Sequence, residues 1–100
     1  MISAEEVIDP DLPIIDPHHH LWDRNGDRYL LDELLADTAQ ADAHGARHNV
    51  RGTVFVECAA MYNAGGPDPM RPLGETEFVN GIAAMSASGG YGDTRVAAGI

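Results

Sequence analysis

The sequence predicts an α/β fold in which parallel strands alternate with helices. Segments rich in β-branched and apolar residues alternate with segments whose apolar residues recur at helical spacing. The strongest strand candidate, residues 52–58 (GTVFVEC), is almost continuously apolar, as expected of a parallel strand that is buried on both faces. The resulting order of strand, helix, strand, helix, strand indicates right-handed crossovers and two βαβ units.

The N-terminal third of the chain is predicted to hold one strand between two irregular segments. The first thirteen residues, which carry two glutamates, two aspartates and two prolines, are expected to be an irregular acidic lead-in to a domain spanning residues 14–100. Residues 12–16 form a short apolar run that suits a buried strand. A polar loop is expected over residues 17–28, with Asn25-Gly26 as its turn signal.

The rest of the chain supplies the two helices and the remaining strand. Leucines at helical spacing predict a helix over residues 29–43, which Gly45 would end. Residues 59–74 are rich in glycine and proline and should form a long irregular loop. A second helix is expected over residues 75–87, and a third strand over residues 95–100.

Charge and composition exclude several classes of partner. The formal net charge of −10, from 16 acidic and 6 basic residues, repels nucleic-acid phosphates and anionic lipid surfaces. We therefore expect no nucleic-acid partner and no membrane partner. The single cysteine, Cys58, fits a reducing compartment. The N-terminal residues lack the basic and apolar parts of a secretory signal, so a cytoplasmic protein is expected.

The segment with the clearest chemistry is the histidine cluster that follows the first predicted strand. In an extended chain alternate side chains share a face, so Asp16, His18 and His20 would point one way and His19 the other. Two imidazoles at this spacing can converge on one cation, with metal–nitrogen bonds of about 2.0–2.1 Å. Asp16 could join them as a ligand or orient an imidazole by hydrogen bonding. The spacing is equally compatible with a solvated histidine cluster in a surface loop.

Several segments together resemble one enzyme family. DPHHHLWD is similar to the Asp-x-His-x-His signature that ends the first strand of amidohydrolase-superfamily barrels. The Trp-Asp pair resembles the branch that includes fuconolactonase and dicarboxylate lactonases. VFVECAA, GETEFVNGIA and RVAAGI resemble that branch's second strand, the start of its next helix and its third strand. The likeness covers most of residues 14–100.

This resemblance implies a fold, a cofactor and a reaction. The fold would be a (β/α)₈ TIM barrel of about 250 residues, of which this chain would hold only the N-terminal β/α units, an incomplete barrel. His18 and His20 would be the first-strand ligands of a divalent metal, zinc or manganese, although members of this branch differ in their use of metal. Water bound to the metal would attack a lactone, ester or amide carbonyl. The family's later ligands and its general base would lie on strands beyond residue 100.

Two further groups of residues, outside the histidine cluster, carry side chains that could act in a site. Glu57 lies in an apolar run near the end of the second predicted strand. Burial of a carboxylate there costs free energy unless the group is ion-paired or hydrated. Glu57 would either face the pocket as a catalytic or substrate-binding group, or pair with Arg51 or Arg71. His44 and His48 would lie at the face opposite the site, so neither is assigned a role.

Three hypotheses follow from these residues. The chain is the N-terminal portion of a hydrolase for a small-molecule carbonyl substrate, or it belongs to a decarboxylase or hydratase on the same scaffold. The third hypothesis is a non-catalytic truncated chain, whose open sheet edges would favour self-association. In each case the isolated chain is expected to show no turnover of lactones.

Overall fold

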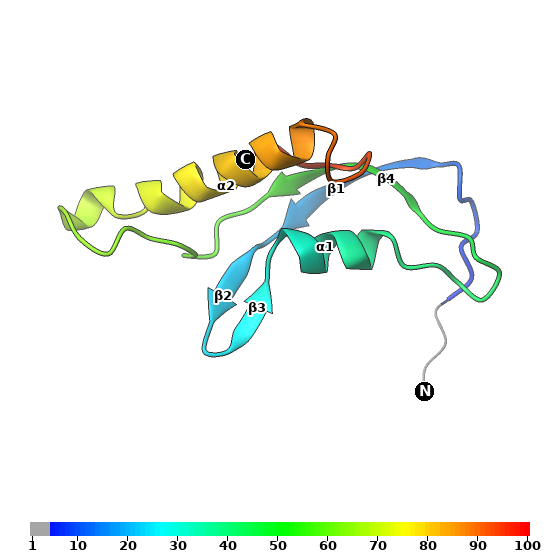
Figure 1. Ribbon diagram of the computed structural model, residues 1–100, viewed down its shortest axis with the longest axis horizontal. Coiled ribbons are helices and arrows are strands. Elements are labelled where there is room, and N and C mark those ends of the chain that lie inside the picture. Colours follow the sequence, from blue (N-terminus) through cyan, green and yellow to red (C-terminus); the bar gives the residue numbers. More distant parts are fainter. Residues whose placement is uncertain (1–4) are drawn as a thin grey trace.

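A three-stranded parallel sheet forms the centre of the molecule. The computed structural model describes residues 5–100, and within them β4 (Asn49–Phe55) lies between β1 (Pro13–His19) and β5 (Arg95–Gly99). Both pairings are parallel, as the alternation of strands and helices predicted. The molecule is elongated, with extents of 52 × 30 × 22 Å (Figure 1).

A two-stranded antiparallel hairpin interrupts the first crossover between parallel strands. Its strands are β2 (Trp22–Arg24) and β3 (Asp27–Tyr29), and they lie on the underside of the view in Figure 1. Asn25 and Gly26 connect them with φ values of 52° and 78°, the left-handed conformations that a two-residue hairpin loop requires. The Asn-Gly turn signal is therefore confirmed, but the strands on either side of it were predicted as loop.

The hairpin is closed by aromatic stacking. The rings of Trp22 and Tyr29 lie directly opposite in the ladder, with centroids 5.1 Å apart and planes inclined at 22°. The indole Nε1 of Trp22 also donates a hydrogen bond to Asp27 Oδ2 at 3.0 Å. Tyr29, the first residue of the predicted helix, therefore belongs to the hairpin instead.

Two α-helices lie within residues 5–100. Helix α1 (Leu31–Thr38) is shorter than predicted, and helix α2 (Leu73–Ala87) begins two residues before its predicted start. The loop before α2 includes a single 3₁₀ turn, η1 (Asp68–Met70). Helix α2 lies against β5, whereas α1 lies beside β3 of the hairpin.

The apolar sides of the helices, β4 and β5 share one core. Its most buried members come from the turn after β1, from both helices and from the two strands, and they are Leu21, Leu31, Leu34, Phe55, Val79, Ile82, Val96 and Ala97. Leu21 and Val79 are completely buried. Burial of this set, at about 25 cal/mol per Å² of apolar area, supplies the main stabilisation of the domain.

The prediction of TIM-barrel β/α units is wrong. Within residues 5–100 the chain is a small mixed domain with one parallel and one antiparallel sheet, and no barrel unit is evident. In a barrel each crossover helix packs on the sheet, but here the first crossover is divided between a hairpin and an eight-residue helix. The parallel sheet is open, with β1 and β5 as its edges.

The early end of α1 is followed by a hydrogen-bonded loop. The loop that follows contains Asp42, whose carboxylate accepts hydrogen bonds from the backbone amides of Val7, His44 and Ala46 at 2.8–3.0 Å. A side chain that satisfies nearby backbone donors in this way favours a loop over a continued helix. The bond to Val7 also ties the predicted lead-in to the domain, although residues 1–4 of that lead-in lie outside the described part of the chain.

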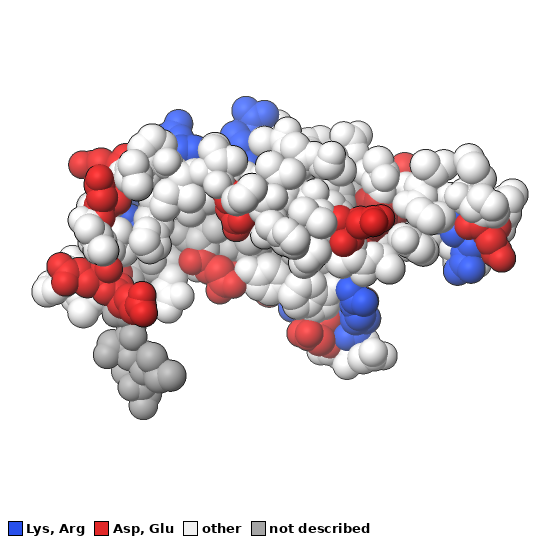
Figure 2. Space-filling view, turned by 180° about the vertical axis from the view of Figure 1, so that it is seen from behind, with Lys and Arg blue, Asp and Glu red and all other residues white. Residues whose placement is uncertain are grey.

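The surface charge is unevenly distributed. On the face shown in Figure 2, carboxylates gather near the N-terminal segment, while the arginines lie in separate places. Neither helix of the described chain has the length and hydropathy that a membrane span requires.

Candidate functional site

Two histidines meet at the carboxyl end of β1. The Nε2 atoms of His18 and His20 lie 3.1 Å apart, and their rings meet edge to face with centroids 4.9 Å apart. The prediction that these two side chains share a face is confirmed. His18 is exposed to solvent and His20 is half-buried, so the pair lies at the surface and the protein packs only around His20.

The ring of His20 is held in one orientation and one tautomer. Its Nδ1 atom lies 2.7 Å from the carbonyl oxygen of Val56, in the residue that follows β4. Because a carbonyl oxygen can only accept, Nδ1 carries the proton and the neutral ring presents a lone pair at Nε2. In the neutral pair, His18 Nε2 then donates to His20 Nε2.

The neighbours of this pair have different environments. Asp16 Oδ1 accepts a hydrogen bond from the backbone amide of His18 at 3.1 Å, which fixes the turn of the backbone but engages no ring nitrogen. His19 is buried on the opposite side and packs edge-on against Phe55, with centroids 5.6 Å apart. Burial lowers the pKa of His19, and the nearby Asp16 charge opposes this effect only in part. The alternation predicted for the triplet is therefore present.

The donor set fits part of a metal site. Two metal–nitrogen bonds of about 2.0–2.1 Å can span the 3.1 Å between the two Nε2 atoms, so one ion can contact both. His18 would then carry its proton on Nδ1, as His20 already does. Within residues 5–100, however, no third His, Cys, Asp or Glu side chain joins them as a group able to hold a metal. The pair thus supplies two positions of a coordination sphere.

A cavity of about 350 Å³ opens at the carboxyl end of β4. Apolar side chains form most of its wall, and Glu57, Glu75 and Thr76 add polar groups. Glu57 is exposed to solvent, and none of the ion pairs in the described chain involves it. The alternative that Glu57 pairs with Arg71 is not seen, because Arg71 lies 3.8 Å from Asp68 instead.

Glu75, which was not among the predicted site residues, is a buried carboxylate. It is 5% exposed, in the first turn of α2, and its Oε2 atom accepts hydrogen bonds from the backbone amides of Cys58 and Ala60 at 3.0 and 2.9 Å. It therefore holds the backbone just beyond β4. The sequence signal for this role was a glutamate at the start of a helix that follows a Gly-rich loop. Its hydrogen-bond partners lie 15 and 17 residues away in the sequence, so the signal did not identify them.

Cys58 belongs to the same turn and is not a candidate nucleophile. Its Sγ lies 3.3 Å from the carbonyl oxygen of Leu21, and its own carbonyl accepts a hydrogen bond from Arg24 at 3.0 Å. Burial, together with the Glu75 charge, raises the pKa of the thiol. A raised pKa leaves less thiolate, which is the reactive form.

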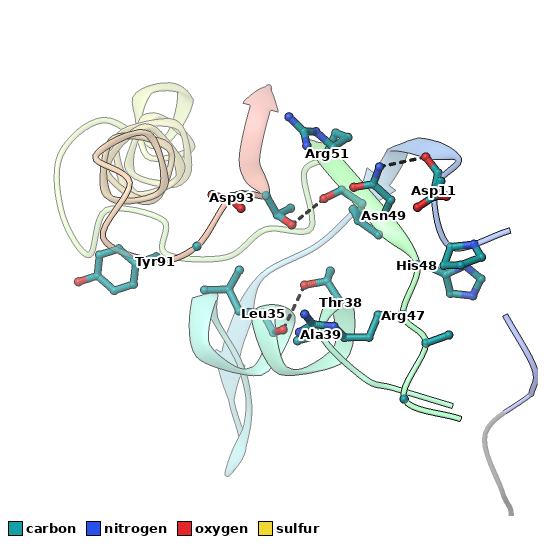
Figure 3. A pocket seen from close by; sticks show the side chains of 16 residues that line it. Asp11, Leu35, Thr38, Ala39, Arg47, His48, Asn49, Arg51, Tyr91 and Asp93 are labelled. Atoms are coloured by element: carbon teal, nitrogen blue, oxygen red, sulfur yellow. Dashed lines mark hydrogen bonds between the residues drawn. The ribbon is translucent and has the colours of Figure 1, made fainter. Parts of the chain in front are cut away.

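A larger hollow, of about 780 Å³, lies at the opposite end of the strands. Figure 3 shows its lining, which includes Arg47 and His48 from the segment that leads into β4 and Arg51 from β4 itself. In this view Arg47 extends toward the end of α1, Arg51 extends away from it, and His48 points to a third side. Because these groups do not converge, the hollow offers no focused binding position. His48 lies at the end away from the site, as predicted.

Part of the chain has a counterpart in a known protein. The chain is similar to an uncharacterised protein of Sinorhizobium fredii, y4mH, with 32% identity over 84 residues that cover 73% of this chain. The chain spans 27% of the length of that relative. No family model matches the chain. No solved structure matches it either.

Proposed function

We propose that this chain supplies the histidine ligands of a metal-dependent hydrolase that acts on a lactone, ester or amide carbonyl. The observation that carries the proposal is the approach of His18 Nε2 and His20 Nε2 to 3.1 Å, with His20 held in the tautomer that leaves Nε2 free to bind. The likeness of DPHHHLWD to the first-strand signature of amidohydrolases supports the reaction class.

Each residue has a distinct task in this proposal. His18 and His20 hold a divalent ion, zinc or manganese, and the Val56 carbonyl orients the His20 ring. Asp16 shapes the backbone that carries His18. When bound, the ion supplies an acidified water and polarises the substrate carbonyl. The remaining positions around the ion are left to water or to groups outside residues 5–100.

The cavity beside Val56 is the proposed place for the body of the substrate. Its volume of about 350 Å³ suits a small molecule. Phe55, Val56 and Pro72 offer apolar contact, while the exposed carboxylate of Glu57 can accept hydrogen bonds from substrate hydroxyl groups. A small, partly apolar molecule with hydroxyl groups and a reactive carbonyl fits this lining.

The metal site can be tested by titrating the purified chain with Zn²⁺ and Mn²⁺ in a calorimeter. One ion should bind per chain, and His18→Ala and His20→Ala should each abolish binding, because a single imidazole remains. His44→Ala is the matched control, since its exposed ring lies beyond α1, and it should bind as the unaltered chain does. Equal binding by all four proteins would contradict the proposal.

The reaction is tested separately. The 100-residue chain should not hydrolyse lactones, esters or amides, because two histidines do not complete a catalytic site. A longer protein that contains these residues together with further metal ligands should hydrolyse members of such a panel, and His20→Ala should remove that activity while His44→Ala leaves it unchanged. Hydrolysis that survives both His18→Ala and His20→Ala would overturn the assignment.

A further inference from the structure

Helix α2 places a buried carboxylate, that of Glu75, against the turn that follows β4. Glu75 is 5% exposed, and burial of a charged group is costly unless hydrogen bonds compensate for it. The compensation comes from two backbone amides on one oxygen, Oε2. Hydrogen bonds from amides to an ionised carboxylate are stronger than those between neutral groups.

The turn that Glu75 holds has a strained backbone. Ala59 and Met61 have φ values of 62° and 58°, in the left-handed region that non-glycine residues rarely adopt. The amides of Cys58 and Ala60, the residues that flank the left-handed Ala59, both donate to the same carboxylate oxygen. Such strain persists only where the surroundings over-determine it, and the two hydrogen bonds to Glu75 are among the contacts that hold this turn.

The same turn is continuous with the group that orients His20. Val56 lies two residues before Cys58, and it is bonded twice to the histidine segment. Its amide donates to the His19 carbonyl oxygen at 2.8 Å, and its carbonyl accepts from His20 Nδ1 at 2.7 Å. The position of the Val56 carbonyl therefore depends on β4 on one side and on the Glu75-bound turn on the other.

We propose that Glu75 is the positioning residue for His20. Its carboxylate fixes the turn at residues 58–60, the turn fixes the Val56 carbonyl, and that carbonyl holds His20 with its Nε2 lone pair toward His18. The role in metal affinity rests on the proposed function, but the effect on the His20 tautomer does not. Loss of an outer group that orients a ligand typically weakens metal binding 10–100-fold.

The first measurement is the tautomer of His20 in the metal-free chain, read from ¹⁵N-labelled histidine by NMR. The unaltered chain should show Nδ1 protonated. Glu75→Ala should give a mixture of tautomers, whereas Glu75→Gln should retain the original one, because the amide oxygen still accepts both backbone bonds. Glu77→Ala, which removes an exposed carboxylate of the same helix, should change nothing.

The second measurement is calorimetric titration of the same four proteins with Zn²⁺. Affinity should fall about 10–100-fold in Glu75→Ala and stay close to that of the unaltered chain in Glu75→Gln. Should Glu75→Ala fail to fold, Glu75→Asp replaces it. That variant keeps the charge at the helix start, but its shorter side chain cannot reach both amides.

The outcomes separate the two proposals. A folded Glu75→Ala or Glu75→Asp with the original His20 tautomer and unchanged zinc affinity overturns the positioning role, and the proposed function stands. If the unaltered chain binds no zinc, the proposed function fails, and a shifted tautomer in Glu75→Ala still supports the positioning role. Failure of Glu75→Gln to rescue the tautomer also overturns it, because the argument depends on an acceptor at this point.

Discussion

The hydroxyl group of Ser86 joins helix α2 to the edge strand β5 through Val96. Ser86 Oγ accepts a hydrogen bond from the Val96 amide at 2.8 Å and donates one to the Thr94 carbonyl oxygen at 2.9 Å. Ser86 is 2% exposed and Val96 is 1% exposed, so water cannot replace the bond between them. A polar side chain on the buried face of α2 thus completes the hydrogen bonding of an irregular strand.

Replacement of this hydroxyl group should destabilise the chain. Ser86→Ala leaves the Val96 amide buried without an acceptor, and we expect the free energy of unfolding to fall by about 1–3 kcal/mol. Urea denaturation followed by circular dichroism measures the change. Ser88→Ala, at the exposed C-cap of the same helix, should shift stability by no more than about 0.5 kcal/mol. Equal changes in the free energy of unfolding at both positions would show that the Ser86 hydrogen bonds contribute no more to stability than an exposed serine does.

Two glycines of α2 should respond in opposite directions to alanine. A Cβ atom on Gly74 would lie 2.7 Å from the Asn63 amide nitrogen and would also contact the Met61 carbonyl oxygen, so Gly74→Ala must displace the loop. A Cβ atom on Gly81 meets nothing within 4 Å, and Gly81→Ala should stabilise the helix by about 0.5–1 kcal/mol. Thermal unfolding of the two variants checks both signs. An unchanged melting temperature for Gly74→Ala would contradict the close approach.

The carboxylate of Asp42 should make the free energy of unfolding depend on pH in the acidic range. Its pKa is held below the ordinary value of 3.8, chiefly by the hydrogen bond from the Val7 amide. A carboxyl group with a lowered folded-state pKa contributes stability that is complete above its unfolded-state pKa and is lost as pH falls through the folded-state pKa. Stability should therefore decline as the pH falls below about 4.

Asp42→Asn should flatten this acid dependence and lower stability at neutral pH, because its amide nitrogen cannot accept a hydrogen bond. Urea denaturation at a series of pH values from neutrality downward measures both effects. The matched control is Asp23→Asn, whose exposed side chain accepts no hydrogen bond within residues 5–100. An acid dependence that is the same in Asp42→Asn and in the unaltered chain would contradict the role given to Asp42.

His19 should be dispensable for metal binding and unfavourable for stability. Both of its ring nitrogens are buried, and neither has a hydrogen-bond partner among the described residues. His19→Phe keeps a ring against Phe55 and removes the unsatisfied nitrogens, so the free energy of unfolding should rise by about 1 kcal/mol. Zinc affinity should not change, because this ring faces away from His18 and His20. Loss of zinc binding in a folded His19→Phe would show that the triplet acts as a unit.

The predictions that succeeded depend on local rules. The apolar run at residues 52–58 led to β4, although the strand lies three residues earlier, at Asn49–Phe55. Asn25-Gly26 marked a turn because few other pairs accept two left-handed residues. The alternation of side chains along β1 brought His18 and His20 to one face. Each of these rules involves residues close together in the sequence.

The predictions that failed depend on cross-strand contacts or on distant partners rather than on periodicity. The hairpin at residues 22–29 is short and polar, and it is recognisable mainly from the stacking of Trp22 on Tyr29. The end of α1 depends in part on Asp42, which is bonded to Val7 across 35 residues. The barrel inference extended a likeness of motifs to an architecture, and the hairpin and short helix in the first crossover contradict it.

By itself, the sequence determined that parallel strands alternate with helices, that a turn lies at Asn25-Gly26 and that His18 and His20 share a face, since periodicity and turn chemistry act over a few residues. Only the tertiary structure decided which carbonyl orients His20, which carboxylate holds the turn after β4, and how the first crossover is divided. Those outcomes depend on hydrogen bonds and packing between segments 15 or more residues apart. Such contacts form only when the core has brought the segments together.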